Sequence, residues 1–296
     1  MPLVSIVIPA FNAGRFIGRA LNGVLAQTHA EWEVVVVEDG THDETEAVVR
    51  EFAGSVSQPV RYENNGVNLG VSVTRNRALG QAAGKVIAFL DADDWWAPEH
   101  LAEGLKTLEK GADLCFSGFH LYDESAQKEL ETFVPDLAEL GNPLTRLFRS
   151  NFIQTSSLVM VRREAAEKAG GFDVDLKVGE DCDYWMRILA CGHKLACTGQ
   201  ATCYYTKHSG SAMAKTLLVA EHSVKFCRKH LHSDFLPRAL RKEQYANSLW
   251  IYGRLMQRQN PPLARALLLE AWRSKPLDCR YLAHAIRAWG LALLHK

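Results

Sequence analysis

Residues 85–94 have the sequence KVIAFLDADD, a short apolar run that stops abruptly at a cluster of aspartates. Residues 33–41, EVVVVEDGT, repeat this design, with four consecutive valines before acidic and turn-forming residues. Unbroken apolar runs of this kind are typical of strands buried on both faces of a parallel sheet. We expect strands at 3–9, 33–38, 60–63, 85–90, 113–119, 157–162 and 201–206, and helices at 16–25, 41–52, 71–82, 98–108 and 182–190. The alternation predicts an α/β fold with a mostly parallel, Rossmann-like sheet covered by helices on both faces.

Polar residues follow three of these strands, at 10–12, 38–41 and 91–94. Ligands of such sheets bind outside the carboxyl ends of the strands, so we expect the three clusters to meet at one site. Asp91 and Asp93 are two residues apart and point the same way in an extended segment. Because Mg²⁺ typically binds one or two carboxylates together with substrate phosphates, this pair favours a cation and diphosphate site.

Helix starts are expected where side chains can cap free backbone N–H groups. Thr41 and Glu44 have the spacing of a capping box. Asp94, taken alone, is better interpreted as an acid in the turn before the next helix, where it favours the helix amino end. The acidic pair 180–181 is similarly placed to cap the helix expected at 182–190.

The composition excludes several classes of protein. Of the 296 residues, 47% are hydrophobic and 23% are charged, which argues against wholesale disorder. The seven cysteines form no C-x-x-C pair, which disfavours a secreted disulfide scaffold. Zinc is also disfavoured, because Cys191, His193, Cys197 and Cys203 do not have a usual ligand spacing. No apolar run reaches the roughly 20 residues that a membrane-spanning helix needs.

Charge divides the chain into two parts. Residues 1–214 contain 19 Lys and Arg against 29 Asp and Glu, whereas residues 215–296 contain 15 against 5. The later part has an all-helical pattern, and an amphipathic helix is expected at 279–294. We therefore expect two domains, 1–212 and 213–296. The basic region either contacts an anionic membrane surface or packs on the acidic domain, and it lacks the aromatic interleaving of nucleic-acid readers.

Five motifs occur in an order that resembles family 2 glycosyltransferases, which have the GT-A fold. They are VSIVIPAFN (4–12), QTHAEWEVVVVEDGTHDET (27–45), NLGVSVTRNRAL (68–79), FLDADD (89–94), and GGFD (170–173) followed by GED (179–181). Each motif is weak alone, but their shared order is specific. The resemblance covers roughly residues 3–212, so it implies a GT-A domain followed by a C-terminal all-helical extension.

The resemblance implies that one group of residues binds a nucleotide-sugar donor. Asp39 would accept a hydrogen bond from a uracil or thymine N–H, a role that suits a carboxylate. Asp91 would contact the ribose. Arg75 would hold the nucleotide, and a helix-surface salt bridge is the alternative for this residue. The other residues implied at this site are Pro9, Ala10, Asn12 and Ala92.

A second group is implied to act on the reaction. Asp93 and His208 would bind Mg²⁺ or Mn²⁺, which stabilises the leaving nucleoside diphosphate. An isolated surface histidine is an equally open interpretation of His208. Asp181 would be the base that removes the acceptor proton, with Glu180 near the sugar or acceptor.

These observations favour an inverting, metal-dependent glycosyltransferase. It would move a sugar from a UDP- or dTDP-sugar to a glycan or lipid-linked acceptor in surface polysaccharide synthesis, in the cytoplasm or peripherally on the inner face of the cell membrane. Trp95 and Trp96 either form a platform for sugar or acceptor or pack in the core. A sugar nucleotidyltransferase is disfavoured because residues 10–15 form no glycine-rich loop. A non-catalytic nucleotide-sugar-binding protein is disfavoured by Asp93 and Asp181 together.

Overall fold

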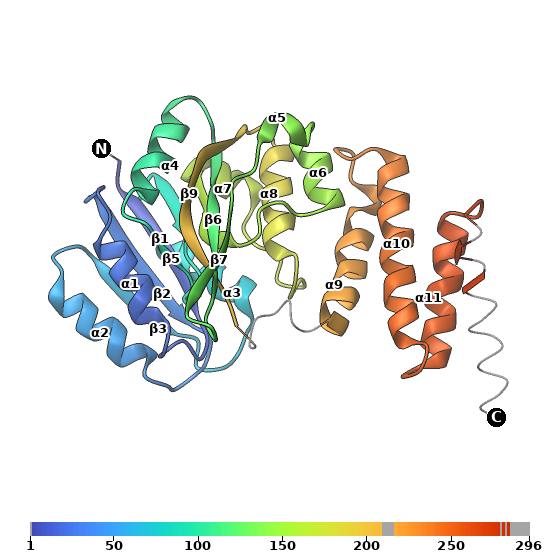
Figure 1. Cartoon of the computed structure of the whole chain (residues 1–296), viewed down its shortest axis with the longest axis horizontal. Coiled ribbons are helices and arrows are strands. Elements are labelled where there is room, and N and C mark those ends of the chain that lie inside the picture. Colours follow the sequence, from blue (N-terminus) through green and yellow to red (C-terminus); the bar gives the residue numbers. More distant parts are fainter. Residues whose placement is uncertain (1, 209–215, 279, 282, 285–296) are drawn as a thin grey trace. The chain divides into compact units, whose positions relative to one another are not determined.

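The protein consists of two compact units, Met1–Ser209 and Gly210–Lys296. The computed structural model describes residues 2–208, 216–278, 280–281 and 283–284 (Figure 1). The first unit combines a sheet with helices, and the second is helical. The α/β fold with a C-terminal helical extension is therefore confirmed, and the division lies a few residues before the boundary expected at 213.

The first unit is built on one sheet whose strands run in the order β3-β2-β1-β4-β8-β6-β9-β5, with β7 paired to β6. The strands are β1 (Val4–Ala10), β2 (Trp32–Glu38), β3 (Val60–Asn64), β4 (Val86–Phe89), β5 (Trp95–Trp96), β6 (Leu114–Asp123), β7 (Lys128–Phe133), β8 (Val159–Arg162) and β9 (Leu195–Lys207). The pairings give β1, β2, β3, β4, β6 and β9 the same direction, whereas β5, β7 and β8 are antiparallel to their neighbours. The sheet is thus mostly parallel, as expected.

Helices surround this sheet in Figure 1. They are α1 (Ile17–Leu25), α2 (Thr45–Ser55), α3 (Val71–Gln81), α4 (His100–Glu109), α5 (Leu137–Leu140), α6 (Pro143–Arg149), α7 (Arg163–Ala169) and α8 (Glu180–Ala190). Every residue of β1 and β2 is buried, because helices and loops cover both faces. The stripe expected on α4 is also buried, with Leu101, Leu105 and Leu108 at most 6% exposed.

The capping box expected at Thr41 and Glu44 is wrong. The helix begins only at Thr45, and Thr41 instead donates its hydroxyl hydrogen bond to Glu38 at the end of β2. Asp43 instead supplies the side-chain hydrogen bond at the start of α2, because its Oδ1 accepts from the Thr45 backbone N–H at 3.0 Å. Several short elements of this unit were not expected. They include the strands β5, which pairs with β9, and β7, whose residues are all exposed, and the helices α5, α6 and α7.

The second unit contains α9 (Thr216–Lys229), a 3₁₀ turn η3 (His230–His232), α10 (Arg238–Met256) and α11 (Pro261–Ser274). Helices α10 and α11 pack closely: a Cβ added to Gly253 would lie 2.9 Å from Cγ of Leu268, which is fully buried. Among the described residues, no helix is both long enough and apolar enough to cross a membrane. The amphipathic helix expected at 279–294 lies largely outside the described residues.

Candidate active site

The carboxyl ends of β2, β1 and β4 are neighbours, which brings the first polar clusters together. Ala10 pairs with Glu38 at the ends of β1 and β2, and the Asp39 N–H donates to the Ala10 carbonyl at 2.8 Å. Pro9 and Ala10, the last two residues of β1, are buried. Asn12 has a φ of +50°, a left-handed conformation that asparagine tolerates better than most residues.

Asp39 ties the end of β2 to the loop that precedes α3. Its Oδ1 accepts from the Leu69 N–H at 2.8 Å and from Asn65 Nδ2 at 2.9 Å, and its Oδ2 accepts from the Gly70 N–H at 2.9 Å. The adjacent Gly40, with φ of +76°, lets this loop approach, because a Cβ there would lie 2.2 Å from the Val67 carbonyl carbon. A carboxylate accepts about four hydrogen bonds, so the described residues leave roughly one acceptor position of Asp39 unused.

Arg75 of α3 forms ion pairs with two acids, one after the end of a strand and one at the start of a helix. Its Nη2 is 2.7 Å from Asp91 Oδ1, after β4, and its Nη1 is 2.7 Å from Glu180 Oε1, at the start of α8. The Arg75 side chain is only 5% exposed. Burial lowers the pKa of Arg75, but the charges of Asp91 and Glu180 outweigh it and hold the pKa above its ordinary value. Arg75 is therefore a buried bridge and not a helix-surface ion pair.

Asp181 lies beside this bridge, in the first turn of α8. The expectation that residues 180–181 precede and cap the helix is wrong, because Gly179, with φ of +80°, is the N-cap and both acids are helical. Asp181 Oδ1 accepts from the Cys182 N–H at 2.6 Å. Burial, together with the charge of Glu180, raises the pKa of Asp181 to about 7, and the Arg75 charge opposes this rise. A carboxyl group with such a pKa suits proton transfer near neutral pH.

Asp93 and His208 come together from separate strand ends. His208 Nε2 is 2.8 Å from Asp93 Oδ2, and this hydrogen bond raises the pKa of His208. No group of three or more His, Cys, Asp or Glu side chains suited to a metal occurs in the described part of the chain. The pair nevertheless fits a divalent cation, since a hard cation typically takes only one or two protein carboxylates when substrate phosphates complete its shell.

Asp94 does not belong to the turn before α4, contrary to expectation. It is 1% exposed, and its carboxylate accepts from Ser157 Oγ at 2.6 Å and from the Thr206 N–H at 2.9 Å. Burial, with the charges of Asp93 and Asp91, raises its pKa well above the ordinary value. Asp94 therefore fixes the ends of β4 and β9 and the segment 155–157 against one another.

The two tryptophans after this cluster differ in environment. Trp96 is 2% exposed, stacks on His100, and donates from Nε1 to the Ser157 carbonyl at 2.7 Å, so it offers little surface to a ligand. Trp95 is partly exposed, but two side chains cover its ring. The Arg19 guanidinium carbon lies 4.0 Å from the ring centroid, and the stacked Tyr204 ring lies 4.7 Å away, centroid to centroid. Ala92 is also buried.

Residues 5–170 match a known family, described as Glycosyl transferase family 2. The chain belongs to glycosyl transferase family 2. The match covers more than half of the chain, and it confirms the membership that the sequence motifs predicted. The protein is accordingly a transferase of the glycosyl type.

Several named glycosyltransferases are similar in sequence. Putative teichuronic acid biosynthesis glycosyltransferase TuaG of Bacillus subtilis is 28% identical over 195 residues, 64% of this chain and 73% of that protein. The UDP-Glc:alpha-D-GlcNAc-diphosphoundecaprenol beta-1,3-glucosyltransferase WfgD of Escherichia coli is 40% identical over 99 residues, 33% of this chain and 38% of that protein. An uncharacterized glycosyltransferase of Nostoc is 39% identical over 180 residues, 58% of this chain and 54% of its own length. These relatives thus contain sequence beyond the matched segments.

Two solved structures share the fold. S. aureus TarS 1–349 in complex with UDP-GlcNAc has a TM-score of 0.72 at 19% identity, covering 97% of this chain and 89% of its own. The mannosyltransferase PcManGT of Pyrobaculum calidifontis, in complex with GDP-Man and Mn²⁺, has a TM-score of 0.65 at 22% identity, covering 100% of this chain and 81% of its own. At these identities the likeness establishes the fold.

Sequence reasoning missed two features of this family 2 site. Thr155 and Ser157 support the aspartates, because the Asp91 N–H donates to Ser157 Oγ at 2.9 Å and Thr155 Oγ1 donates to Asp91 Oδ2 at 3.1 Å. Apolar side chains are also exposed beside the strand ends: Phe11 is 53% exposed and Leu69 is 42% exposed. The sequence offered one signal for the exposed apolar surface, namely Phe11, an aromatic residue within a polar cluster.

Proposed function

We propose that this protein transfers a sugar from a UDP- or dTDP-sugar to a hydroxyl group of a glycan or lipid-linked acceptor, with inversion at the anomeric carbon. The observation that carries the proposal is the Arg75 bridge, which joins Asp91 to Glu180 with 2.7 Å contacts next to Asp181. Acids from two separate segments, the end of β4 and the start of α8, are thereby joined at one site, as expected of a donor-binding and proton-accepting centre.

The donor would bind across the ends of β1, β2 and β4. The open acceptor position of Asp39 suits a pyrimidine imide N–H, because a carboxylate can only accept. Exposed Phe11 provides an apolar surface at the same edge of the sheet. Asp91, held by Arg75, would accept a hydrogen bond from a ribose hydroxyl.

Asp181 would act as the general base. The acceptor oxygen attacks the anomeric carbon from the face opposite the diphosphate, and its proton passes to a carboxylate oxygen of Asp181. The bond from the anomeric carbon to the diphosphate oxygen breaks, and its electron pair leaves with the nucleoside diphosphate. A positioned base typically contributes about 10²–10⁴-fold to the rate. A single displacement of this kind inverts the anomeric centre.

Asp93 and His208 would hold a divalent cation, Mg²⁺ or Mn²⁺. Such a cation, when bound, supplies positive charge to the leaving diphosphate. The contact of 2.8 Å between these side chains supports a shared ligand. The Mn²⁺ in the PcManGT complex is in line with this assignment.

Two relatives support the choice of acceptor class. TuaG is named for teichuronic acid biosynthesis and WfgD for a diphosphoundecaprenol-linked acceptor. We therefore favour a surface polysaccharide precursor as acceptor. A location on the inner face of the cell membrane stays a prediction that rests on this acceptor class.

The variant Asp181→Asn tests the proposal. Asparagine keeps the size of the side chain but accepts no proton, so UDP-sugar binding measured by calorimetry should be retained while transfer falls at least about a hundredfold. Asp175→Asn, an exposed acid in the loop before α8, is the matched control. Transfer that persists at the wild-type rate in Asp181→Asn would exclude this base, and loss in both variants would exclude a specific role.

A further inference from the structure

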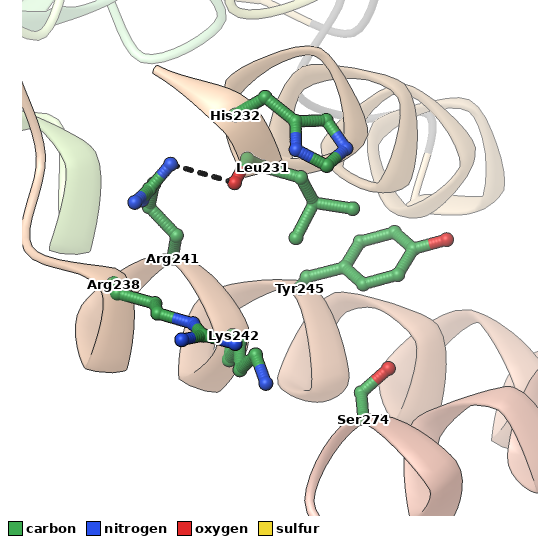
Figure 2. Close-up of a pocket in the computed structure, with 7 residues that line it drawn as sticks. All are labelled: Leu231, His232, Arg238, Arg241, Lys242, Tyr245 and Ser274. Carbon is green, nitrogen blue, oxygen red and sulfur yellow. Dashed lines mark hydrogen bonds between the residues drawn. The ribbon is translucent and has the colours of Figure 1, made fainter. Parts of the chain in front are cut away.

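The helical unit contains a cavity of about 420 Å³ between η3, the first turns of α10 and the end of α11. Figure 2 shows Arg238, Arg241 and Lys242 of α10 along one side of it, with His232 and Ser274 on neighbouring segments. Within the described residues, its lining includes no Asp or Glu. The cavity wall is therefore strongly cationic.

Arg238 and Lys242 are not neutralised by the chain. Both are exposed, and neither has a carboxylate within 4.0 Å in the described parts of the protein. Some cations elsewhere in this unit do find partners: Lys275 is 3.8 Å from Glu243, for example. The feature particular to the cavity is that Arg238 and Lys242 line the same hollow as Arg241 without a counter-charge from the described residues.

Arg241 is held in place with an unused donor. Its Nη1 donates to the Leu231 carbonyl at 2.7 Å, drawn as the dashed line in Figure 2. Its Nε is buried and has no hydrogen-bond partner among the described residues. A buried donor without a partner costs free energy, and an acceptor from a ligand would remove that cost.

The start of α10 adds a second attraction for an anion. The N-cap is Pro237, no side chain caps the helix, and the first turn contains no acid. The amino end of a helix carries partial positive charge, so cations in its first turns are normally unfavourable. An anion bound there would be stabilised by the helix and by Arg238, Arg241 and Lys242 together.

The hydroxyl groups of the cavity are already engaged. Tyr245 donates its hydroxyl to Glu270, and Ser274 Oγ donates to the Glu270 carbonyl at 2.9 Å. A sugar would need neutral donors and acceptors that are free to exchange hydrogen bonds. The side chains of this wall that are left to bind a ligand are instead cationic, which favours an anion over a neutral carbohydrate.

We propose that this cavity binds a phosphate group, carried by a diphosphate or a phosphodiester. The planar guanidinium groups of Arg238 and Arg241 match phosphate oxygens in pairs, and Lys242 adds a point charge. The phosphate comes either from the head group of an anionic phospholipid or from a phosphate-bearing acceptor in solution. The site lies wholly within the helical unit, so its existence does not depend on the proposed transfer reaction.

Calorimetric titration with inorganic pyrophosphate tests the site directly. EDTA is present and donor is absent, so cation-dependent binding at the strand-end site does not contribute. The variant Arg238→Ala/Lys242→Ala should bind pyrophosphate at least about tenfold more weakly than the wild type, because charge-assisted hydrogen bonds are lost. Arg254→Ala/Arg258→Ala, which removes the same charge near the other end of α10, should stay within about twofold. Both substitutions replace exposed residues, and thermal unfolding checks that the variants fold.

Equal affinity in the wild type and the cavity variant would overturn the proposal, as would equal losses in both variants. Sedimentation with vesicles then separates the two sources. If phosphatidylglycerol vesicles retain the wild type and the control but not the cavity variant, and phosphatidylcholine vesicles retain none, the phosphate is a lipid head group. If no protein sediments but pyrophosphate binding still requires Arg238 and Lys242, the phosphate belongs to a soluble acceptor.

Discussion

Replacing Arg75 by glutamine removes the cation that joins the acids of the active site. The Arg75 side chain is 5% exposed and makes contacts of 2.7 Å with both Asp91 and Glu180. Removing one partner of a buried ion pair typically costs about 3–5 kcal/mol, because the remaining charge is left without compensation. For a unit of this size, that loss corresponds to a decrease in Tm of roughly 10 °C.

Differential scanning calorimetry measures this effect against Arg50→Gln. Arg50 forms an ion pair with Glu46 at 2.6 Å, but its side chain is 70% exposed. Exposed pairs of this spacing contribute about 0.3–0.5 kcal/mol, so the control should change Tm by little more than 1 °C. If Arg75→Gln lowers Tm no further than Arg50→Gln does, the buried bridge does not stabilise the site as argued.

The same substitution has a second effect that a purely structural arginine would not produce. The charge of Arg75 lowers the pKa of Asp181, opposing burial and Glu180. In Arg75→Gln the pKa of Asp181 should rise above about 7, and the acidic limb of the pH profile of kcat/KM should move to higher pH. An unchanged limb in a folded variant would show that Arg75 and Asp181 are not coupled.

Three further predictions address other parts of the site. In the wild type, kcat/KM should rise with pH around a midpoint near 7, because burial raises the pKa of Asp181 to about 7 and only its ionised form accepts a proton; a flat profile there would exclude this role. Gly40→Ala should cost about 1–3 kcal/mol or more and weaken UDP binding, since φ is +76° and the added Cβ would lie 2.2 Å from the Val67 carbonyl carbon; a wild-type Tm would contradict the observed packing. Asp93→Ala should bind UDP equally with and without Mn²⁺ in calorimetry, whereas a retained Mn²⁺ dependence would remove Asp93 from the cation site.

Much of the fold was predictable because its signals are local. The valines of β2 and the leucine stripe of α4 are buried, as their apolar patterns indicated. The rule that ligands bind at strand ends also led to Asp39, Asp91 and Asp93 without any knowledge of their spatial neighbours. These features depend on residues close together in the chain, where periodicity carries information.

Two errors concern side chains whose partners are distant in sequence. Asp94 was interpreted from the adjacent helix, but its partners Ser157 and Thr206 follow 63 and 112 residues later. The error at Thr41 was local: it had the spacing of a capping box, but its hydroxyl donates to Glu38, which precedes it at the end of β2. Trp96 could not be separated from an exposed platform residue, because its burial depends on pairing between β5 and β9.

The central claim is that separate acids meet around one cation and one donor, and anomalous diffraction tests it most directly. Crystals grown with Mn²⁺ and a non-transferable UDP-sugar analogue should give a manganese peak within about 2.0–2.6 Å of an Asp93 carboxylate oxygen, the usual range for oxygen ligands of divalent cations. The Asp181 carboxylate should face the anomeric carbon of the same analogue. A manganese peak away from Asp93, or an analogue whose sugar lies beyond the reach of Asp181, would contradict the account.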